Sequence, residues 1–207
     1  AMAWNKQICL PLGLMQVVCM ALLMAVVGCG QTPTKEDKPN IKPEALATDP
    51  SGKIAKVIPN PYLEQAGDAP AVAKTEFVRI QSLIKNGRSN EDVTALTKMR
   101  QDSPKLSGPA VNLGLLYWKQ KNYAQAQQNF EQAQNINKYN PDAYTQYAVM
   151  LREQGKFSDA EAQFLKALAV WPHNLQAHRD LGVLYDLYLV QPEKALQHFT
   201  MCDQLSS

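Results

Sequence analysis

Residues 113–117 read Leu-Gly-Leu-Leu-Tyr, residues 147–151 read Tyr-Ala-Val-Met-Leu, and residues 181–185 read Leu-Gly-Val-Leu-Tyr. The three stretches are evenly spaced along the chain, and each places a small residue second, between larger apolar neighbours. Self-similarity at a fixed period indicates a repeat architecture, in which each unit stacks on the next. These stretches therefore decide the fold class.

A second set of landmarks follows each stretch at the same spacing. It consists of an alanine, a phenylalanine and another small residue: Ala126, Phe130 and Ala133, then Ala160, Phe164 and Ala167, then Ala195, Phe199 and Cys202. The third set comes one residue late relative to the interval between the first two. We therefore predict one inserted residue in the turn around Gln191-Pro192.

The period and the residues at these positions are similar to the tetratricopeptide repeat, a family whose units are about 34 residues long. Each unit of that family is a pair of antiparallel helices. The resemblance implies an all-α helix-turn-helix solenoid, with small residues where two helices come closest and aromatic residues filling the gaps. It places turns at Lys121-Asn122 and at Gly155. Three full repeats are expected, at residues 107–140, 141–174 and 175–207.

Both ends of this array differ from its middle. Residues 73–106 look like a degenerate first unit, because Leu83, Leu96 and Met99 keep the register while the small residues are lost. Terminal repeats are expected to be atypical because one side faces solvent. The sequence ends at Ser207, directly after the last expected helix. We therefore expect an uncapped C-terminal repeat that pairs with another protein, pairs with a second copy of the chain, or is only marginally stable.

The N-terminal segment has the features of a targeting sequence. Residues 8–28 contain no charged side chain, which fits either an uncleaved membrane anchor or a signal peptide. Val26-Val27-Gly28-Cys29 resembles a lipobox, the motif of bacterial lipoprotein signal peptides. The resemblance implies cleavage after residue 28 and lipidation of Cys29, and several acyl chains on one cysteine give stable membrane anchoring.

The residues that follow bear on the destination of the protein. In Gram-negative lipoproteins an aspartate directly after the lipidated cysteine retains the protein in the inner membrane. This chain has Gly30 there, which resembles the pattern of outer-membrane lipoproteins. We therefore expect an outer-membrane protein that faces the periplasm, with the inner membrane as the alternative.

A proline-rich segment separates the anchor from the repeats. Seven of the thirteen prolines fall between residues 30 and 70, with few apolar residues at regular spacing. Such a composition predicts a flexible tether over residues 29–72, because it buries too little surface to offset the entropy of ordering. As an alternative, Ile54, Val57 and Ile58 form a short strand that binds a partner.

The composition and motifs exclude several functions. A net charge of +2, without runs of Lys or Arg, argues against nucleic-acid binding. We find no Gly-x-Ser-x-Gly elbow, phosphate loop or dinucleotide motif, and expect neither an enzyme nor a cofactor. The histidines His173, His178 and His198 lack metal-site spacing and are expected on the surface or in the groove, with no metal. Cys202 is expected to be a buried, inert thiol.

A protein or peptide partner is the remaining ligand class. Tetratricopeptide arrays bind such partners on a concave groove made by the first helix of each unit. The expected groove residues are Val111, Leu115, Trp118 and Lys119, then Thr145, Val149 and Arg152, then Arg179, Val183 and Asp186. Trp118 and Arg152 are the expected anchors, since Trp and Arg are enriched among binding hot spots.

Some members of the family grip a terminal carboxylate with Lys and Asn across successive repeats. Asn112 and Lys119 match part of that pattern, whereas the next unit has Gln146 and Glu153 at the equivalent positions. This departure argues against carboxylate capture.

The order of lipobox, tether and short repeat array resembles the pilotin-type envelope lipoproteins of type IV pili and secretion systems. It is also similar to lipoprotein adaptors that gather cell-wall enzymes. We therefore expect an assembly or adaptor scaffold anchored to a membrane by its lipid. The alternative is a structural envelope lipoprotein that self-associates.

Overall fold

The computed structural model describes residues 54, 56–66, 69–85 and 89–206. The predicted signal peptide, Cys29 and the first part of the predicted tether lie outside these residues. The chain divides into two units, Ala1–Lys38 and Pro39–Ser207, and every structural statement below concerns the second.

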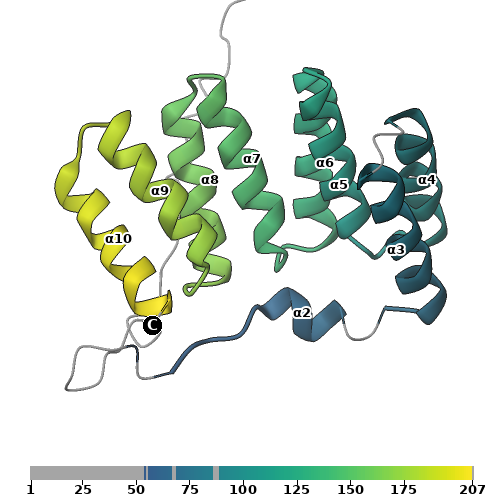
Figure 1. Ribbon diagram of the computed structural model, residues 1–207, viewed down its shortest axis with the longest axis horizontal. Coiled ribbons are helices and arrows are strands. Elements are labelled where there is room, and N and C mark those ends of the chain that lie inside the picture. Colours follow the sequence, from purple (N-terminus) through teal and green to yellow (C-terminus); the bar gives the residue numbers. More distant parts are fainter. Residues whose placement is uncertain (1–53, 55, 67–68, 86–88, 207) are drawn as a thin grey trace, which may run out of the picture. The chain divides into compact units, whose positions relative to one another are not determined.

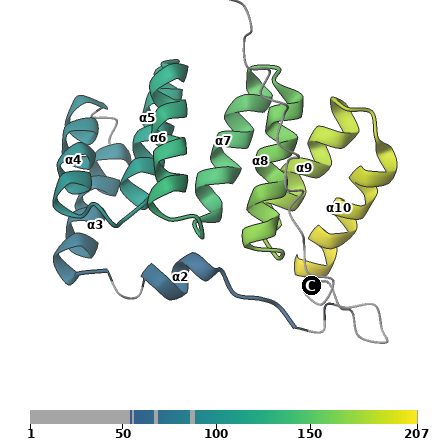
Figure 2. The same ribbon diagram turned by 180° about the vertical axis from the view of Figure 1, so that it is seen from behind.

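The described residues form a short helix followed by four helical hairpins (Figure 1). The short helix is α2 (Pro61–Ala66), and the hairpins are α3 (Ala71–Lys85) with α4 (Ser89–Asp102), α5 (Gly108–Lys119) with α6 (Tyr123–Ile136), α7 (Pro141–Glu153) with α8 (Phe157–Val170), and α9 (Leu175–Leu187) with α10 (Pro192–Ser206). The predicted all-α repeat fold is confirmed, and the hairpins follow one another in sequence order (Figures 1 and 2).

The small residues of the repeat allow the two helices of a hairpin to come close. A Cβ atom built on Gly114 of α5 would lie 2.7 Å from the Phe130 ring of α6, and one on Gly182 of α9 would lie 2.7 Å from the Phe199 ring of α10. Neither distance is possible for a real side chain. The aromatic rings therefore occupy the space that glycine leaves, and Phe130 is fully buried there.

The turn inside each full hairpin contains one residue with a left-handed backbone. These residues are Lys121 (φ 62°), Gly155 (φ 74°) and Val190 (φ 53°). The first two are one repeat period apart, and Val190 comes one residue later than that period requires. The predicted insertion near Gln191 is confirmed, because four residues separate α9 from α10 and three separate the helices of the two preceding hairpins.

Buried amide side chains connect one hairpin to the next. Asn140 precedes α7, caps it by accepting from the Asp142 N–H at 3.1 Å, and donates to the Ser107 hydroxyl at the start of α5 at 2.9 Å. Asn174 has the same place before α9, where it accepts from the Ala177 N–H at 3.2 Å. Because buried amides must be hydrogen-bonded, these residues fix the spacing between the starts of successive first helices.

The first hairpin has its own small core. Ile80 of α3 and Leu96 of α4 are fully buried in a cluster that also takes in Leu113 and Leu116 of α5. Helix α4 contacts α5 as extensively as it contacts α3, whereas the helices of the later hairpins contact each other far more than their neighbours. The loss of small residues in this unit therefore coincides with a looser hairpin.

The segment before α3 differs from the tether that its composition predicts. Helix α2 lies within it, and Asn60 closes the start of that helix by accepting from the Tyr62 N–H at 3.0 Å. The backbone of Ile58 bonds to side chains of the α8–α9 connection, 113 and 115 residues away in the chain. Ile58 is outside any strand, and its backbone is bonded to side chains of the array. A short strand that binds a partner stays a prediction.

We expect Gly114→Ala to destabilise the array, because the added methyl group would overlap the Phe130 ring. Overpacking costs about 1–3 kcal/mol, partly offset by the better helix propensity of alanine, about 1 kcal/mol. Because the added methyl group would lie 2.7 Å from a fully buried ring, the upper part of this range applies, and urea unfolding should show a net loss of about 1–2 kcal/mol.

The double variant Gly114→Ala/Phe130→Leu is the control, since the smaller leucine leaves room for the methyl group. The two substitutions should be less harmful together than the sum of their separate effects. A Gly114→Ala protein as stable as the wild type would contradict this account of the hairpin.

Candidate functional site

A cavity of about 670 Å³ lies against the first helices of the hairpins. Its walls include Ala73, Lys74, Phe77 and Gln81 of α3, Val111, Asn112 and Leu115 of α5, Asp142 and Gln146 of α7, and Gln176 of α9. Tyr62 of α2 and Ala69 close it on the side of the N-terminal segment. We call this space the inner cavity.

The polar groups of the inner cavity are mostly side-chain amides. Asn112 and Gln146 are one repeat period apart and so hold the same position in successive repeats, as do Asp142 and Gln176. A side-chain amide has both donors and an acceptor, which suits the N–H and C=O groups of a peptide backbone. Within the array, Asn112 donates to the Gly108 carbonyl at 2.8 Å and Gln176 donates to Asp180 at 2.6 Å. Desolvation raises the pKa of Asp142, the carboxyl group in this wall.

Some of the predicted groove residues face this cavity and others do not. Val111 and Leu115 line it. Val149 and Val183 are half-buried on α7 and α9, and Lys119, Arg179 and Asp186 are exposed; none of these lines the cavity. The structure therefore brings two of the ten predicted residues together in one cavity wall.

Thr145 is the clearest departure from the predicted groove. It is 1% exposed, donates to the Pro141 carbonyl at 2.9 Å, and accepts from the Asn174 amide at 3.3 Å. It therefore joins two repeats from the inside and offers nothing to a partner.

The two predicted anchors bridge neighbouring first helices. Trp118 donates from Nε1 to Glu153 at 2.9 Å, which connects α5 to α7. Arg152 lies 3.6 Å from the Asp180 carboxylate and donates to the Asp180 carbonyl at 3.3 Å, which connects α7 to α9. Both contacts hold the groove together, so neither side chain is simply displayed to a ligand.

Asn112, Gln146 and Gln176 were not predicted as groove residues, although their sequence positions contained the signal. Each residue along a helix turns by about 100°, so neighbouring positions face different directions. Of the predicted residues, Val111 lines the cavity beside Asn112, whereas its repeat equivalent Thr145 does not and Gln146 does. The spacing i, i+4 from the start of each first helix identifies this face.

Residues 105–172 match the family model described as tetratricopeptide repeat. A crystal structure of MamA is similar with a TM-score of 0.56 and 16% identity, covering 70% of this chain and 84% of that chain. A structure of MamA AMB-1 gives a TM-score of 0.52 and 26% identity, covering 70% and 85%. A structure of PilF from Pseudomonas aeruginosa gives 0.58 and 17%, covering 64% of this chain and 60% of that chain. No curated protein matches the sequence.

The fold is a tetratricopeptide-repeat solenoid. Such arrays are scaffolds for protein–protein interaction and are generally not catalytic. Within the part of the chain that the structure describes, no three His, Cys, Asp or Glu side chains are grouped to hold a metal ion.

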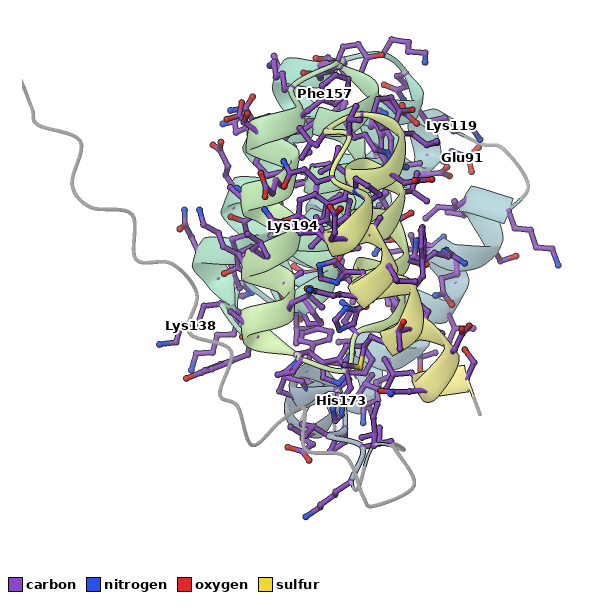
Figure 3. All side chains as sticks on the ribbon, turned by 90° about the vertical axis from the view of Figure 1, so that its left-hand side faces the viewer. Glu91, Lys119, Lys138, Phe157, His173 and Lys194 are labelled. Carbon is purple, nitrogen blue, oxygen red and sulfur yellow. The ribbon has the colours of Figure 1, made fainter. Side chains whose placement is uncertain are left out.

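The histidines of the tetratricopeptide array correct the prediction of surface or groove positions. His173 is 2% exposed and His178 is 4% exposed. Figure 3 labels His173, which lies at the opposite end of α8 from the labelled Phe157. Cys202 also differs from its prediction, because it is half-buried and not fully buried, with its sulfur 3.8 Å from the Leu175 carbonyl oxygen.

His178 and His198 form a bonded pair between α9 and α10. Their Nδ1 atoms are 2.8 Å apart, and His178 Nε2 lies 2.8 Å from the Pro172 carbonyl oxygen. A carbonyl oxygen only accepts, so His178 carries its proton on Nε2 and its Nδ1 accepts the proton of His198 Nδ1. The pair cannot hold a proton on both Nδ1 atoms, so full protonation of both rings breaks it.

Burial keeps both rings neutral. Desolvation lowers the pKa of His178. Desolvation, followed by the charges of His178 and Lys194, lowers the pKa of His198 to about 4. The His198 ring stacks on Tyr185, whose hydroxyl donates to Glu161 at 2.6 Å, so the pair belongs to the packing of the last hairpin.

We expect the last hairpin to lose stability in acid because of this pair. A histidine whose pKa is lowered by folding contributes stability above its ordinary pKa, near 6.5, and loses it as the pH falls toward about 4. The loss by pH 4 is on the order of 3 kcal/mol. Thermal melts between pH 7 and pH 4 should show a smaller decrease for His198→Gln than for the wild type. Parallel curves for the two proteins would contradict this expectation.

Proposed function

We propose that this protein is a membrane-anchored tetratricopeptide scaffold that binds a protein or peptide partner in its inner cavity. The observation that carries the proposal is the cavity itself, which is built from successive repeats and lined by apolar walls with amides in repeat register. Apolar walls give affinity and a few placed polar groups give orientation, which is the usual composition of a binding site. An extended or helical peptide fits such a surface.

The anchor is the second part of the proposal. Cys29 would carry the lipid and hold the protein on the periplasmic side of the outer membrane, with the repeats reaching away from it. Within the described residues, none of the helices combines the length and apolar character that crossing a bilayer requires. The support for the anchor is the lipobox-like stretch Val26-Val27-Gly28-Cys29.

For the partner we propose a component of an envelope machine such as a pilus or a secretion system. The first support is the order of lipobox-like stretch, proline-rich segment and short repeat array in the sequence. The second is the fold that the array shares with PilF. An adaptor for cell-wall enzymes would use the same anchor and the same cavity.

One observation favours self-association as a second function. Leu187, Val190 and Leu196 of the last hairpin are 65%, 77% and 67% exposed. Apolar side chains left in water on a terminal repeat are typical of a surface that another molecule covers.

Site-specific cross-linking in the membrane of living cells would test the cavity. A photoreactive amino acid replacing Gln146, in the cavity wall, should capture a protein partner, whereas the same replacement at the exposed Gln128 of α6 should not. The same replacement at Leu196 should capture a second copy of the chain if the array self-associates. Identical products from positions 146 and 128 would refute the cavity as the binding site.

Substitution provides the second measurement on the same site. Asn112→Ala/Gln146→Ala should reduce the yield of the cross-linked product obtained from a photoreactive residue at Leu115 by about tenfold, as expected for two lost hydrogen bonds. These residues are preferable to Trp118 and Arg152, since removing Arg152 would leave the Asp180 carboxylate, which is 8% exposed, without its cation. An unchanged yield would show that the amides do not contact the partner.

We expect Cys29→Ser to release the protein from the membrane, because serine cannot take the lipid. Fractionation of cells should move the chain from the membrane pellet to the soluble fraction. Substitution of Cys202 with serine is the control and should leave the protein in the pellet. A Cys29→Ser protein that stays in the membrane would indicate that residues 8–28 act as an uncleaved anchor.

A further inference from the structure

The segment that precedes the array is bound to it by its main chain. We call residues 56–66 the strap. The Trp171 indole donates from Nε1 to the Ile58 carbonyl at 2.7 Å, and the Ile58 N–H donates to His173 Nδ1 at 2.7 Å. Two side chains of the α8–α9 connection therefore bind both backbone groups of a single residue.

The backbone of the connection that carries these two side chains is closed by hydrogen bonds within the array. The Trp171 N–H donates to the Ala167 carbonyl at 2.9 Å at the end of α8, and the Trp171 carbonyl accepts from the Asn174 N–H at 3.1 Å. His173, between them, is 2% exposed. Both clamping side chains are thus carried on a turn whose backbone is closed by its own hydrogen bonds.

The side chains of the clamp do not recur in the α6–α7 connection. The positions equivalent to Trp171 and His173 in the α6–α7 connection are Asn137 and Tyr139. There the Asn137 side chain accepts from the Tyr139 N–H at 2.9 Å and closes its own turn. The difference lies in the side chains, since the backbone turn recurs with the repeat.

The other end of the strap enters the inner cavity. Tyr62 of α2 lies in its wall, and a Cβ atom at Gly108, the first residue of α5, would be 3.2 Å from the Tyr62 hydroxyl. The strap therefore reaches from the last repeat connection to the first full repeat and forms one side of the site that we propose for the partner.

The strap is held by few contacts. Helix α2 has six residues, and isolated helices of that length are unstable in water. Val57 and Leu63 are 58% and 66% exposed, so two of its apolar side chains gain little from the contact. A ligand that makes the same main-chain bonds and buries more apolar surface would displace it.

We propose that Trp171 and His173 form a main-chain clamp for an extended segment of the partner, and that the strap occupies this clamp until the partner displaces it. This inference rests on the proposed function, because it assigns the binding mode of the same cavity. The segment must be extended at the clamped residue, which must have an N–H and so is not proline. By analogy with Ile58 and Tyr62, an apolar residue occupies the clamp and an aromatic residue four positions later enters the cavity.

A synthetic peptide with the sequence of residues 54–66 is the probe for this clamp. Its affinity is measured by fluorescence anisotropy against the full chain in detergent micelles. In the variant Ile58→Pro the strap loses the N–H that His173 accepts. In the wild type the strap competes with the peptide, so the apparent affinity for the peptide falls in proportion to the fraction of protein whose clamp is unoccupied. The peptide should therefore bind the Ile58→Pro variant about five- to tenfold more tightly than the wild type.

The matched controls change one aromatic side chain at a time. In the Ile58→Pro background, Trp171→Phe removes the donor of the clamp and should weaken peptide binding about tenfold. Tyr139→Phe changes a residue that is 45% exposed in the α6–α7 connection, outside both the clamp and the inner cavity, and should leave the affinity unchanged. A probe peptide with proline at the position of Ile58 should bind at least tenfold more weakly than the parent peptide.

Two results would overturn the proposal. One is equal affinity of the peptide for the wild type and for Ile58→Pro, which would show that the strap does not compete. The other is peptide binding that survives Trp171→Phe. Circular dichroism of each variant verifies folding, and His173→Leu provides a second way to remove the clamp. The peptide assay needs neither the lipid nor the natural partner, so a failed cross-linking experiment and a failed clamp are distinguishable.

Discussion

The array depends on the contact between a phenylalanine ring and a helix that has no side chain at the point of contact. Gly114 and Gly182 bring the two helices of their hairpins closer than any Cβ atom would allow, and Phe130 and Phe199 fill the space. Ala148 holds the same position in the middle hairpin, where both it and Phe164 are fully buried. This contact fixes each of these hairpins as one unit, and the inner cavity lies against their first helices.

A second constraint acts between hairpins, where hydrogen bonds of buried amides connect one repeat to the next. Asn140 and Asn174 end the connections between hairpins and join the start of one first helix to the next. Because the repeat determines the backbone of these connections, other side chains in them are not needed for the turn and can bind a ligand. The α8–α9 connection places Trp171 and His173 on a fixed turn, and these residues bind the backbone of Ile58. A structural turn thereby provides a binding site.

The sequence predicted the periodic repeat fold but did not predict the contacts between residues that are far apart in the chain. The spacing of Leu113, Tyr147 and Leu181 was sufficient for the fold, because each repeat solves the same packing problem. The groove was assigned one helical position away from the cavity for Thr145, since periodicity alone does not tell which side of a helix faces the next repeat. The pairing of His178 with His198 and the clamp on Ile58 join residues 20 and 115 positions apart, and no local pattern marks either one. The composition of the strap indicated a tether because the bonds that hold Ile58 come from Trp171 and His173 of the array, which the local sequence of the strap does not reveal.

The division of roles between clamp and cavity has a consequence for specificity. Hydrogen bonds to an N–H and a C=O do not distinguish one side chain from another, so the clamp contributes affinity and direction but little selectivity. Selectivity then falls to the cavity, where Asn112 and Gln146 stand in repeat register beside the apolar walls of α3 and α5. Any partner must also bind tightly enough to displace the strap, so segments with weak, non-specific affinity do not occupy the site. A site closed by its own chain in this way responds to few ligands, although its main contacts are ones that every peptide can make.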